Sequence, residues 1–168
     1  PRWSPDGRLA WSVHRGRLYG FVVCDDDETI FTPTDNAIID IRWSNRNRLA
    51  IAIVNERPGY VDYAIWDDRA YIALSRVAPD LLPIWSAPVW SNDGQLAWIT
   101  FPPPQSTAVL VRWDGEQIDS RETPLGIPFG WTWSDEGQIA WAASGGGTPP
   151  RLLVWDGAAR VLTVTRAV

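Results

Sequence analysis

Few residues in this chain have side chains that catalyse reactions at neutral pH. The 168-residue sequence holds one histidine, His14, and one cysteine, Cys24, and all fifteen of its basic residues are arginines. A zinc-type site needs about four nitrogen or sulfur ligands, and a nucleophilic triad needs a serine beside a positioned histidine and acid. The sequence offers neither set, so we expect no enzyme activity, no catalytic residue, no metal and no cofactor. His14 is predicted to be a solvated residue of a loop over residues 13–16.

The acidic run at residues 25–28 is the other group with metal-binding chemistry. Asp25, Asp26, Asp27 and Glu28 offer the oxygen ligands that Ca²⁺ prefers. The run lies at a predicted turn between two apolar segments and lacks the spaced geometry of a dedicated calcium loop. A solvated acidic turn is therefore the favoured interpretation, with a calcium site as the alternative.

The composition is that of a soluble globular protein. Hydrophobic residues make up 45% and charged residues 21% of the chain, and the formal net charge is −5. This balance argues against nucleic acid and membranes as partners, since nucleic acid and anionic membranes both bind clustered positive charge. No apolar run approaches the roughly 20 residues that span a bilayer. We expect a cytoplasmic protein, although a start at Pro1 and the lack of methionine also fit a fragment, or a product that has lost an export signal.

One nine-residue stretch occurs four times and organises the rest of the chain. It begins at Trp3, Trp43, Trp90 and Trp133, so successive copies lie 40, 47 and 43 residues apart. The first copy, Trp-Ser-Pro-Asp-Gly-Arg-Leu-Ala-Trp, predicts a tight turn followed by a strand, because Ser-Pro-Asp-Gly suits a type I turn. Asn47 replaces the glycine in the second copy. Because Asn tolerates positive φ best after Gly, all four turns are predicted to share one geometry.

Each turn is followed by a second apolar run, which ends 21 to 23 residues after the turn tryptophan in Cys-Asp or Trp-Asp. Further strands are predicted over residues 29–32, 70–75, 117–121 and 161–165, and ahead of later turns over 37–42, 84–89 and 127–132. Each repeat thus has four short strands, and no segment shows a helical period. A four-stranded unit repeated in this way predicts an all-β fold, a β-propeller of antiparallel four-stranded blades. The predicted blades span residues 1–34, 35–80, 81–124 and 125–168.

The repeats resemble those of known propellers. Trp-Ser-Pro-Asp-Gly-x-Leu-Ala resembles the PD40 repeat of TolB-type β-propellers, and the Trp-Asp pairs at 66–67, 113–114 and 155–156 resemble the matching feature of WD40 repeats. The resemblance covers essentially the whole chain. It implies the propeller fold and a role as an interaction platform. The sequence departs from WD40 repeats in lacking their Gly-His dipeptide, and from PD40 repeats in carrying the turn proline only once, at Pro5.

Three ways to complete the ring remain open. The first repeat has only residues 1–3 for its innermost strand, and residues 166–168 alone follow the last predicted strand. Four blades can close weakly on themselves, because rings have roughly four to eight blades. Alternatively, a second copy completes a larger ring as a homodimer, or the chain is a segment of a longer propeller. The first two are favoured about equally, with self-association slightly ahead.

Ten of the twelve tryptophans recur at fixed repeat positions and are predicted to form the core between blades. Trp85 and Trp131 fall outside that register, near the strands expected to line the central channel, where core packing and ligand contact are equally plausible. Those inner strands carry only one acid, Asp40, whereas glycosidases need paired carboxylates. We therefore expect no sugar hydrolysis in the channel.

Binding is predicted on the variable loops of one face, since such loops carry function on a rigid scaffold. These loops are residues 57–60, 102–105 and 145–150, and Asp35, Asp80 and Leu125 should emerge beside them. We interpret the chain as a noncatalytic module that binds a protein or peptide partner. The alternatives are a carbohydrate or small-ligand binder that uses aromatic rings at the channel mouth, and a purely architectural domain. The predicted contact residues are Arg15, Arg57, Tyr60, Trp85 and Trp131.

Overall fold

The computed structural model describes residues 1–56, 58–68, 70–81, 83, 88–101, 107–123, 127–144 and 151–156. These residues form four antiparallel sheets, three with four strands and one with three described strands. In every sheet the strands lie side by side in chain order, as successive hairpins produce. The predicted all-β architecture of four repeated sheets is confirmed. We call the sheets blades 1 to 4 in chain order.

Blade 1 contains β1 (Arg2–Trp3), β2 (Leu9–Arg15), β3 (Leu18–Cys24) and β4 (Thr29–Thr34). Blade 2 contains β5 (Ile38–Trp43), β6 (Leu49–Val54), β7 (Val61–Trp66) and β8 (Tyr71–Ala73). Blade 3 contains β9 (Val89–Trp90), β10 (Leu96–Thr100), β11 (Val109–Trp113) and β12 (Ile118–Glu122). Blade 4 contains β13 (Ile127–Trp133), β14 (Ile139–Ser144) and β15 (Arg151–Trp155). The strand predicted over residues 161–165 and the first part, residues 84–87, of the strand predicted over 84–89 lie outside the described residues.

The repeated turn joins the first two strands of each blade and is closed by its serine. In the second copy the Ser44 N–H donates to the Arg48 carbonyl at 2.8 Å, and Ser44 Oγ accepts from the Arg48 N–H at 3.0 Å. The other three copies repeat both bonds. Asn47 has φ of 59°, and the matching glycines also have positive φ, so the predicted shared geometry is confirmed. We call this end of a blade its turn end, and the opposite end, where blades are connected, its loop end.

The aspartate that ends the second apolar run closes another turn, between the third and fourth strands. Asp114 Oδ1 accepts the backbone N–H groups of Glu116 at 2.9 Å and Gln117 at 2.8 Å. These bonds hold the pKa of Asp114 below its usual value. Asp25 closes the acidic run at residues 25–28 in the same way, and all four of its side chains are exposed. The interpretation of this run as a solvated acidic turn is confirmed.

The apolar core consists of three clusters, one between each pair of neighbouring blades. Along the second strand of a blade, the small alanine faces the following blade, whereas the large residues on either side face the preceding blade. Leu49, Leu96 and Trp98 are fully buried in this way. The prediction that repeat tryptophans form the inter-blade core is wrong for Trp3, which is 70% exposed, because no preceding blade covers it among the described residues.

Two local predictions are also wrong. The strand expected over residues 70–75 stops at Ala73 and continues as a short helix, α1 (Leu74–Val77), followed by the 3₁₀ turn η1 (Pro79–Leu81). A bond from the Ser75 N–H to the Asp62 carboxylate fixes the start of that helix. His14 lies in β2 rather than in a loop, because it pairs across the hairpin with Tyr19 and stacks on that ring at 4.6 Å. Its side chain is exposed, as expected.

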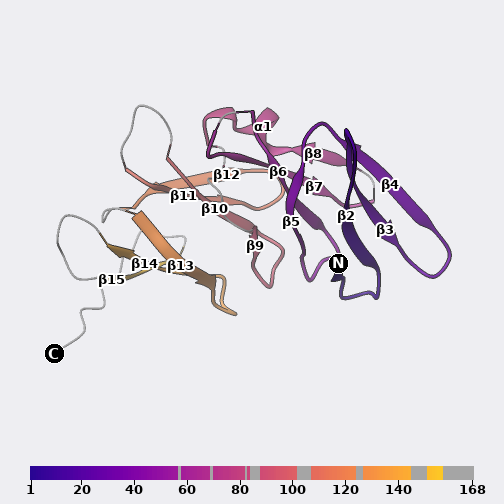
Figure 1. Cartoon of the computed structure of the whole chain (residues 1–168). Helices are drawn as coiled ribbons and strands as arrows, with labels where there is room; N and C mark the ends of the chain where they lie inside the picture. The colour runs from indigo at the N-terminus through magenta and orange to yellow at the C-terminus, as the bar shows by residue number, and fades with distance from the viewer. Residues whose placement is uncertain are drawn as a thin grey trace.

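The blades form an open row. Figure 1 shows the N-terminal blade in indigo and the described strands of blade 4, in orange to yellow, at opposite ends of this row. Neighbouring blades in the chain are also neighbours in space, as the three core clusters require. Among the described residues, no helix has the length and apolar character needed to cross a membrane.

Candidate functional site

The structure places the predicted contact residues on different blades. Arg15 lies exposed at the loop end of β2 in blade 1. Tyr60 lies half-buried before β7 in blade 2, and its hydroxyl donates to the backbone carbonyl of Phe101 in blade 3 at 2.7 Å. Trp131 lies half-buried in β13 and packs against the core between blades 3 and 4. These three residues therefore do not form one site. Arg57 and Trp85 lie outside the described residues.

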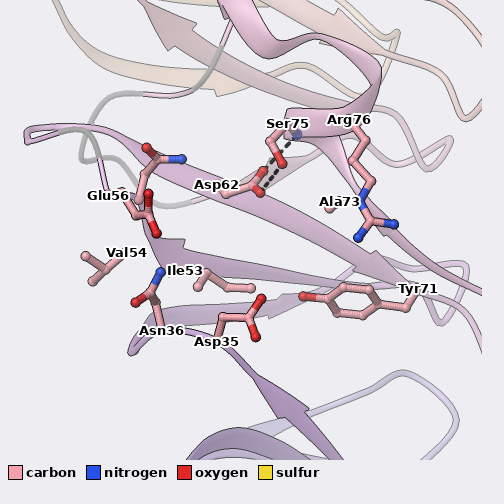
Figure 2. A pocket seen from close by; sticks show the side chains of 11 residues that line it. Asp35, Asn36, Ile53, Val54, Glu56, Asp62, Tyr71, Ala73, Ser75 and Arg76 are labelled. Carbon is pink, nitrogen blue, oxygen red and sulfur yellow. Dashed lines mark hydrogen bonds between the residues drawn. The ribbon is translucent and has the colours of Figure 1, made fainter.

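A polar hollow of about 300 Å³ opens on blade 2 (Figure 2). In register, Asp62 on β7 pairs with Ile53 on β6, and Ile53 belongs to the cluster shared with blade 1. Asp62 therefore lies on the face of blade 2 that is turned toward blade 1. Asp35 comes from the connection between these two blades, and Glu56 from the loop after β6. The other lining residues are Asn36, Val54, Asn55, Tyr71, Ala73, Ser75 and Arg76. We call this hollow the blade-2 pocket.

Asp62 is the most enclosed charged group of the blade-2 pocket. Its carboxylate accepts the backbone N–H of Ser75 at 2.9 Å and also the Ser75 hydroxyl, which ties β7 to α1 (Figure 2). Burial raises the pKa of Asp62 above its usual value, although the Ser75 bonds act in the opposite direction. A carboxylate whose charge is disfavoured by burial gains from a cation placed beside it.

Tyr71 forms another wall of the blade-2 pocket, and Figure 2 shows its hydroxyl directed toward Asp35. Burial, followed by the nearby carboxylates of Asp62 and Asp35, raises the pKa of Tyr71 to about 12. The phenol therefore stays protonated at neutral pH. It can accept a hydrogen bond from a ligand or donate one.

The charge of the pocket is negative. Asp35, Glu56 and Asp62 face one cation, Arg76, so the lining has an excess of two negative charges when all four groups are ionised. Within the described part of the chain, no three His, Cys, Asp or Glu side chains stand close enough together to hold a metal ion. The carboxylates are spread around the hollow, an arrangement that suits an extended organic cation better than a bare ion.

Sequence analysis expected Asp35 on the loop face but missed Asp62, Tyr71 and Arg76. One signal for Asp62 was present, since it is the only charged residue in the otherwise apolar strand Val61–Trp66. The contribution of Arg76 depends on the short helix that replaces the end of the predicted strand. No pattern in the sequence indicated that helix.

A solved β-propeller structure shares this architecture. The chain matches the β-propeller domain of the Trilobed protease from Pyrococcus furiosus, described as having an open velcro topology, with a TM-score of 0.62 and 16% identity over 98% of this chain and 56% of that chain. TolB from Acinetobacter baumannii aligns with a TM-score of 0.41 and 12% identity over 95% of this chain and 53% of that chain. The chain thus spans little more than half the length of either structure. No family model and no curated protein matches it. The match to the protease domain confirms the predicted fold: the four repeats are blades of a β-propeller.

Proposed function

We propose that this chain is a noncatalytic binding module for a protein or peptide, and that the blade-2 pocket receives a basic side chain of that partner. The observation that carries the proposal is the excess of carboxylates around a hollow of about 300 Å³ whose lining also includes Ile53 and Ala73. A guanidinium or ammonium group would lie among Asp35, Glu56 and Asp62, with its methylene stem against Ile53 and Ala73.

The chemistry of the pocket supports binding rather than catalysis. The Ser75 hydroxyl donates to the Asp62 carboxylate, which also accepts the Ser75 backbone N–H and thereby ties α1 to β7. Activation of a serine nucleophile needs a neighbouring general base, most often histidine. The single histidine of the chain instead stacks on Tyr19 in blade 1.

The chain's overall charge of −5 favours a basic partner through long-range attraction. The rival function, carbohydrate binding, needs exposed aromatic faces at the channel mouth. Trp131 is half-buried against the core between blades 3 and 4, so it does not present a fully exposed ring to a sugar.

A charge-matched peptide pair tests the proposal. Fluorescent hexapeptide pools with a fixed central arginine are compared with pools that carry citrulline, which keeps the shape and loses the charge. Fluorescence polarisation should show binding of the arginine pool alone. The Asp35→Asn/Asp62→Asn double variant should lower its affinity at least about tenfold, the size of effect for two hydrogen bonds to a charged group.

The matched control is Asp26→Asn, which removes one negative charge at the turn end of blade 1, away from the blade-2 pocket. It should bind the arginine pool as the unmodified chain does. Equal binding of the arginine and citrulline pools, or unchanged affinity in the double variant, would show that this pocket does not select a basic side chain.

A further inference from the structure

The three interfaces between blades use one repeated hydrogen bond. In each, the turn tryptophan of the later blade donates its indole N–H to the earlier blade. The acceptor is always the backbone carbonyl of the residue just before the earlier turn tryptophan. The three bonds are Trp43 Nε1 to Arg2 O at 3.1 Å, Trp90 Nε1 to Arg42 O at 3.0 Å and Trp133 Nε1 to Val89 O at 3.2 Å.

Apolar packing follows the same rule at every interface. The earlier blade contributes the side of its sheet that bears the small alanine, and the later blade contributes the side with the large residues. Between blades 3 and 4, for example, Ala97 and Leu110 meet Ile139 and Trp141. We call these the alanine side and the large-residue side of a blade.

The large-residue side of blade 1 has no blade against it among the described residues. Trp3 is 70% exposed there, and Leu18 and Phe31, which share this side by strand register, are 47% and 42% exposed. Leu9 is only partly buried here, whereas the leucines at the matching positions of blades 2 and 3, Leu49 and Leu96, are fully buried. This surface has the composition of an interface that lacks its partner.

Blade 4 presents the opposite surface. Its alanine side carries Ala140 and Ala142, paired in register with Val154 and Leu152, and Leu152 is 44% exposed. The carbonyl of Thr132, the residue before its turn tryptophan, is the position that accepts the indole bond in the other blades. The two ends of the row are therefore the two complementary halves of one further interface.

Two of the three internal interfaces also place an arginine of the earlier turn over a tryptophan ring of the later blade. Arg8 of blade 1 lies 5.7 Å from the Trp66 ring of blade 2, and Arg48 lies 5.9 Å from the Trp113 ring of blade 3. At the free ends the corresponding positions hold Gln138 and Cys24. The interface between blades 3 and 4 already has Gln95 at the arginine position, with Arg112 lying 5.1 Å from the Trp155 ring, so Gln138 repeats a residue used inside the row.

We propose that two copies of this chain close an eight-bladed ring, with blade 1 of each copy against blade 4 of the other. A second copy fits as the occupant because it carries both complementary surfaces, whereas in one copy the described strands of blades 1 and 4 lie at opposite ends of an open row (Figure 1). Eight blades are within the roughly four to eight of known rings. This interface uses neither the blade-2 pocket nor its residues.

The first test is solution mass by light scattering during size-exclusion chromatography. The unmodified chain should have about twice the 18.8 kDa of one chain. Trp3→Glu and Leu152→Glu, which place a charge on the two halves of the interface, should each have the mass of a single chain. The control Val77→Glu places the same charge on a residue that is 50% exposed at the end of α1, and it should remain a dimer.

Mixing the two monomeric variants gives the sharper result. In a mixed ring one interface combines both substituted faces, whereas the other combines the unmodified blade 1 of the Leu152→Glu copy with the unmodified blade 4 of the Trp3→Glu copy. Mixed dimers should therefore form. If the dimer were instead held by two blade-1 faces, Trp3→Glu would be monomeric, Leu152→Glu would remain a dimer, and mixing would rescue nothing. That outcome would overturn the proposal. A monomeric unmodified chain would also overturn it.

Cross-linking gives an answer that does not depend on destabilising variants. Gln138→Cys with a short bis-maleimide should join this residue to Cys24 of the other copy and yield covalent dimers, because Cys24 is the chain's own single cysteine. Ser120→Cys, exposed on β12, is the control and should yield none. A cross-link within one chain would show that four blades close on themselves and would refute the dimeric ring.

Discussion

The two ends of each blade are built on different principles. At the turn end the same serine bonds recur in all four blades, and the same indole bond recurs at all three interfaces. At the loop end the described connections differ from blade to blade. Blade 2 alone of the described blades adds a helix, α1, and with it the blade-2 pocket.

This contrast separates stability from recognition. Bonds that repeat in every blade fix the geometry of the row, so a change at the turn end should alter folding and leave the pocket intact. The loop end carries charges that burial disfavours, such as Asp62, and these contribute little to folding. Changes there should affect binding first. The following predictions test this separation.

The largest effect is expected at a turn tryptophan inside the row. Trp90 packs against the core between blades 2 and 3 and donates to the Arg42 carbonyl. Trp90→Ala should lower the free energy of unfolding by about 3 kcal/mol, from lost packing and an unmade hydrogen bond. Urea denaturation followed by fluorescence measures this change. Trp3→Ala is the matched control. It should change the free energy of unfolding of the monomer by less than about 0.5 kcal/mol, since exposed sites tolerate substitution. Equal losses in the two variants would contradict the account of the interfaces.

Loss of the turn serine should have the next largest effect. Ser44 is 1% exposed, and its hydroxyl accepts the Arg48 N–H, which would be left without that partner in Ser44→Ala. We expect a loss of about 1–2 kcal/mol in chemical denaturation. Ser134→Ala removes the same bond from an exposed turn and should cost about 0.5 kcal/mol or less, because water replaces the lost partner. Similar costs at both sites would mean that burial is not the deciding factor.

A smaller change is expected at the one turn without glycine. Asn47 has φ of 59°, a conformation that disfavours residues with a Cβ other than Asn and Asp. Asn47→Ala should lower the melting temperature, at a cost of about 1 kcal/mol. Asn47→Gly should avoid this loss, because it restores the residue found at the matching position of the other three turns. A destabilised glycine variant would indicate that the Asn side chain has another role.

The smallest effect on folding is expected at the loop end, and it depends on pH. Because the pKa of Asp62 is raised in the folded chain, its stabilising contribution is present at low pH and is lost as pH rises through that pKa. Asp62→Asn should therefore match the unmodified chain at acid pH and become relatively more stable toward neutral pH. Denaturation series at several pH values measure the difference. The opposite trend would show that the charged carboxylate stabilises the fold.

Much of the fold was predictable because four copies of one sequence pattern indicate the same local structure. The period, the strand order, the turn geometry and the positive φ of Asn47 all depend on local patterns of small, apolar and polar residues. Burial of Trp3 was predicted wrongly from the same periodicity, since a repeat does not indicate which neighbour is absent at the end of a row.

The site was less predictable because it depends on irregular features. The three described contact residues, Arg15, Tyr60 and Trp131, were chosen for their residue types in loops and channel strands, and the fold places them on three blades. The blade-2 pocket depends instead on the Ser75 hydrogen bonds that bring α1 beside β7. Such long-range bonds leave no periodic trace in the sequence.

The indole bonds all run in one direction, from each later blade to the one before it. The row therefore has a polarity, like a polymer with distinct growing ends. In such linear arrays stability is approximately a sum of blade and nearest-neighbour terms. An additional repeat inserted in frame would bring one indole N–H donor and one backbone carbonyl acceptor. It would therefore lengthen the row without redesign of any existing contact. In a single copy such as the Trp3→Glu variant, unfolding should correspondingly begin at the outermost blades and proceed inward, a sequence that hydrogen exchange would resolve blade by blade.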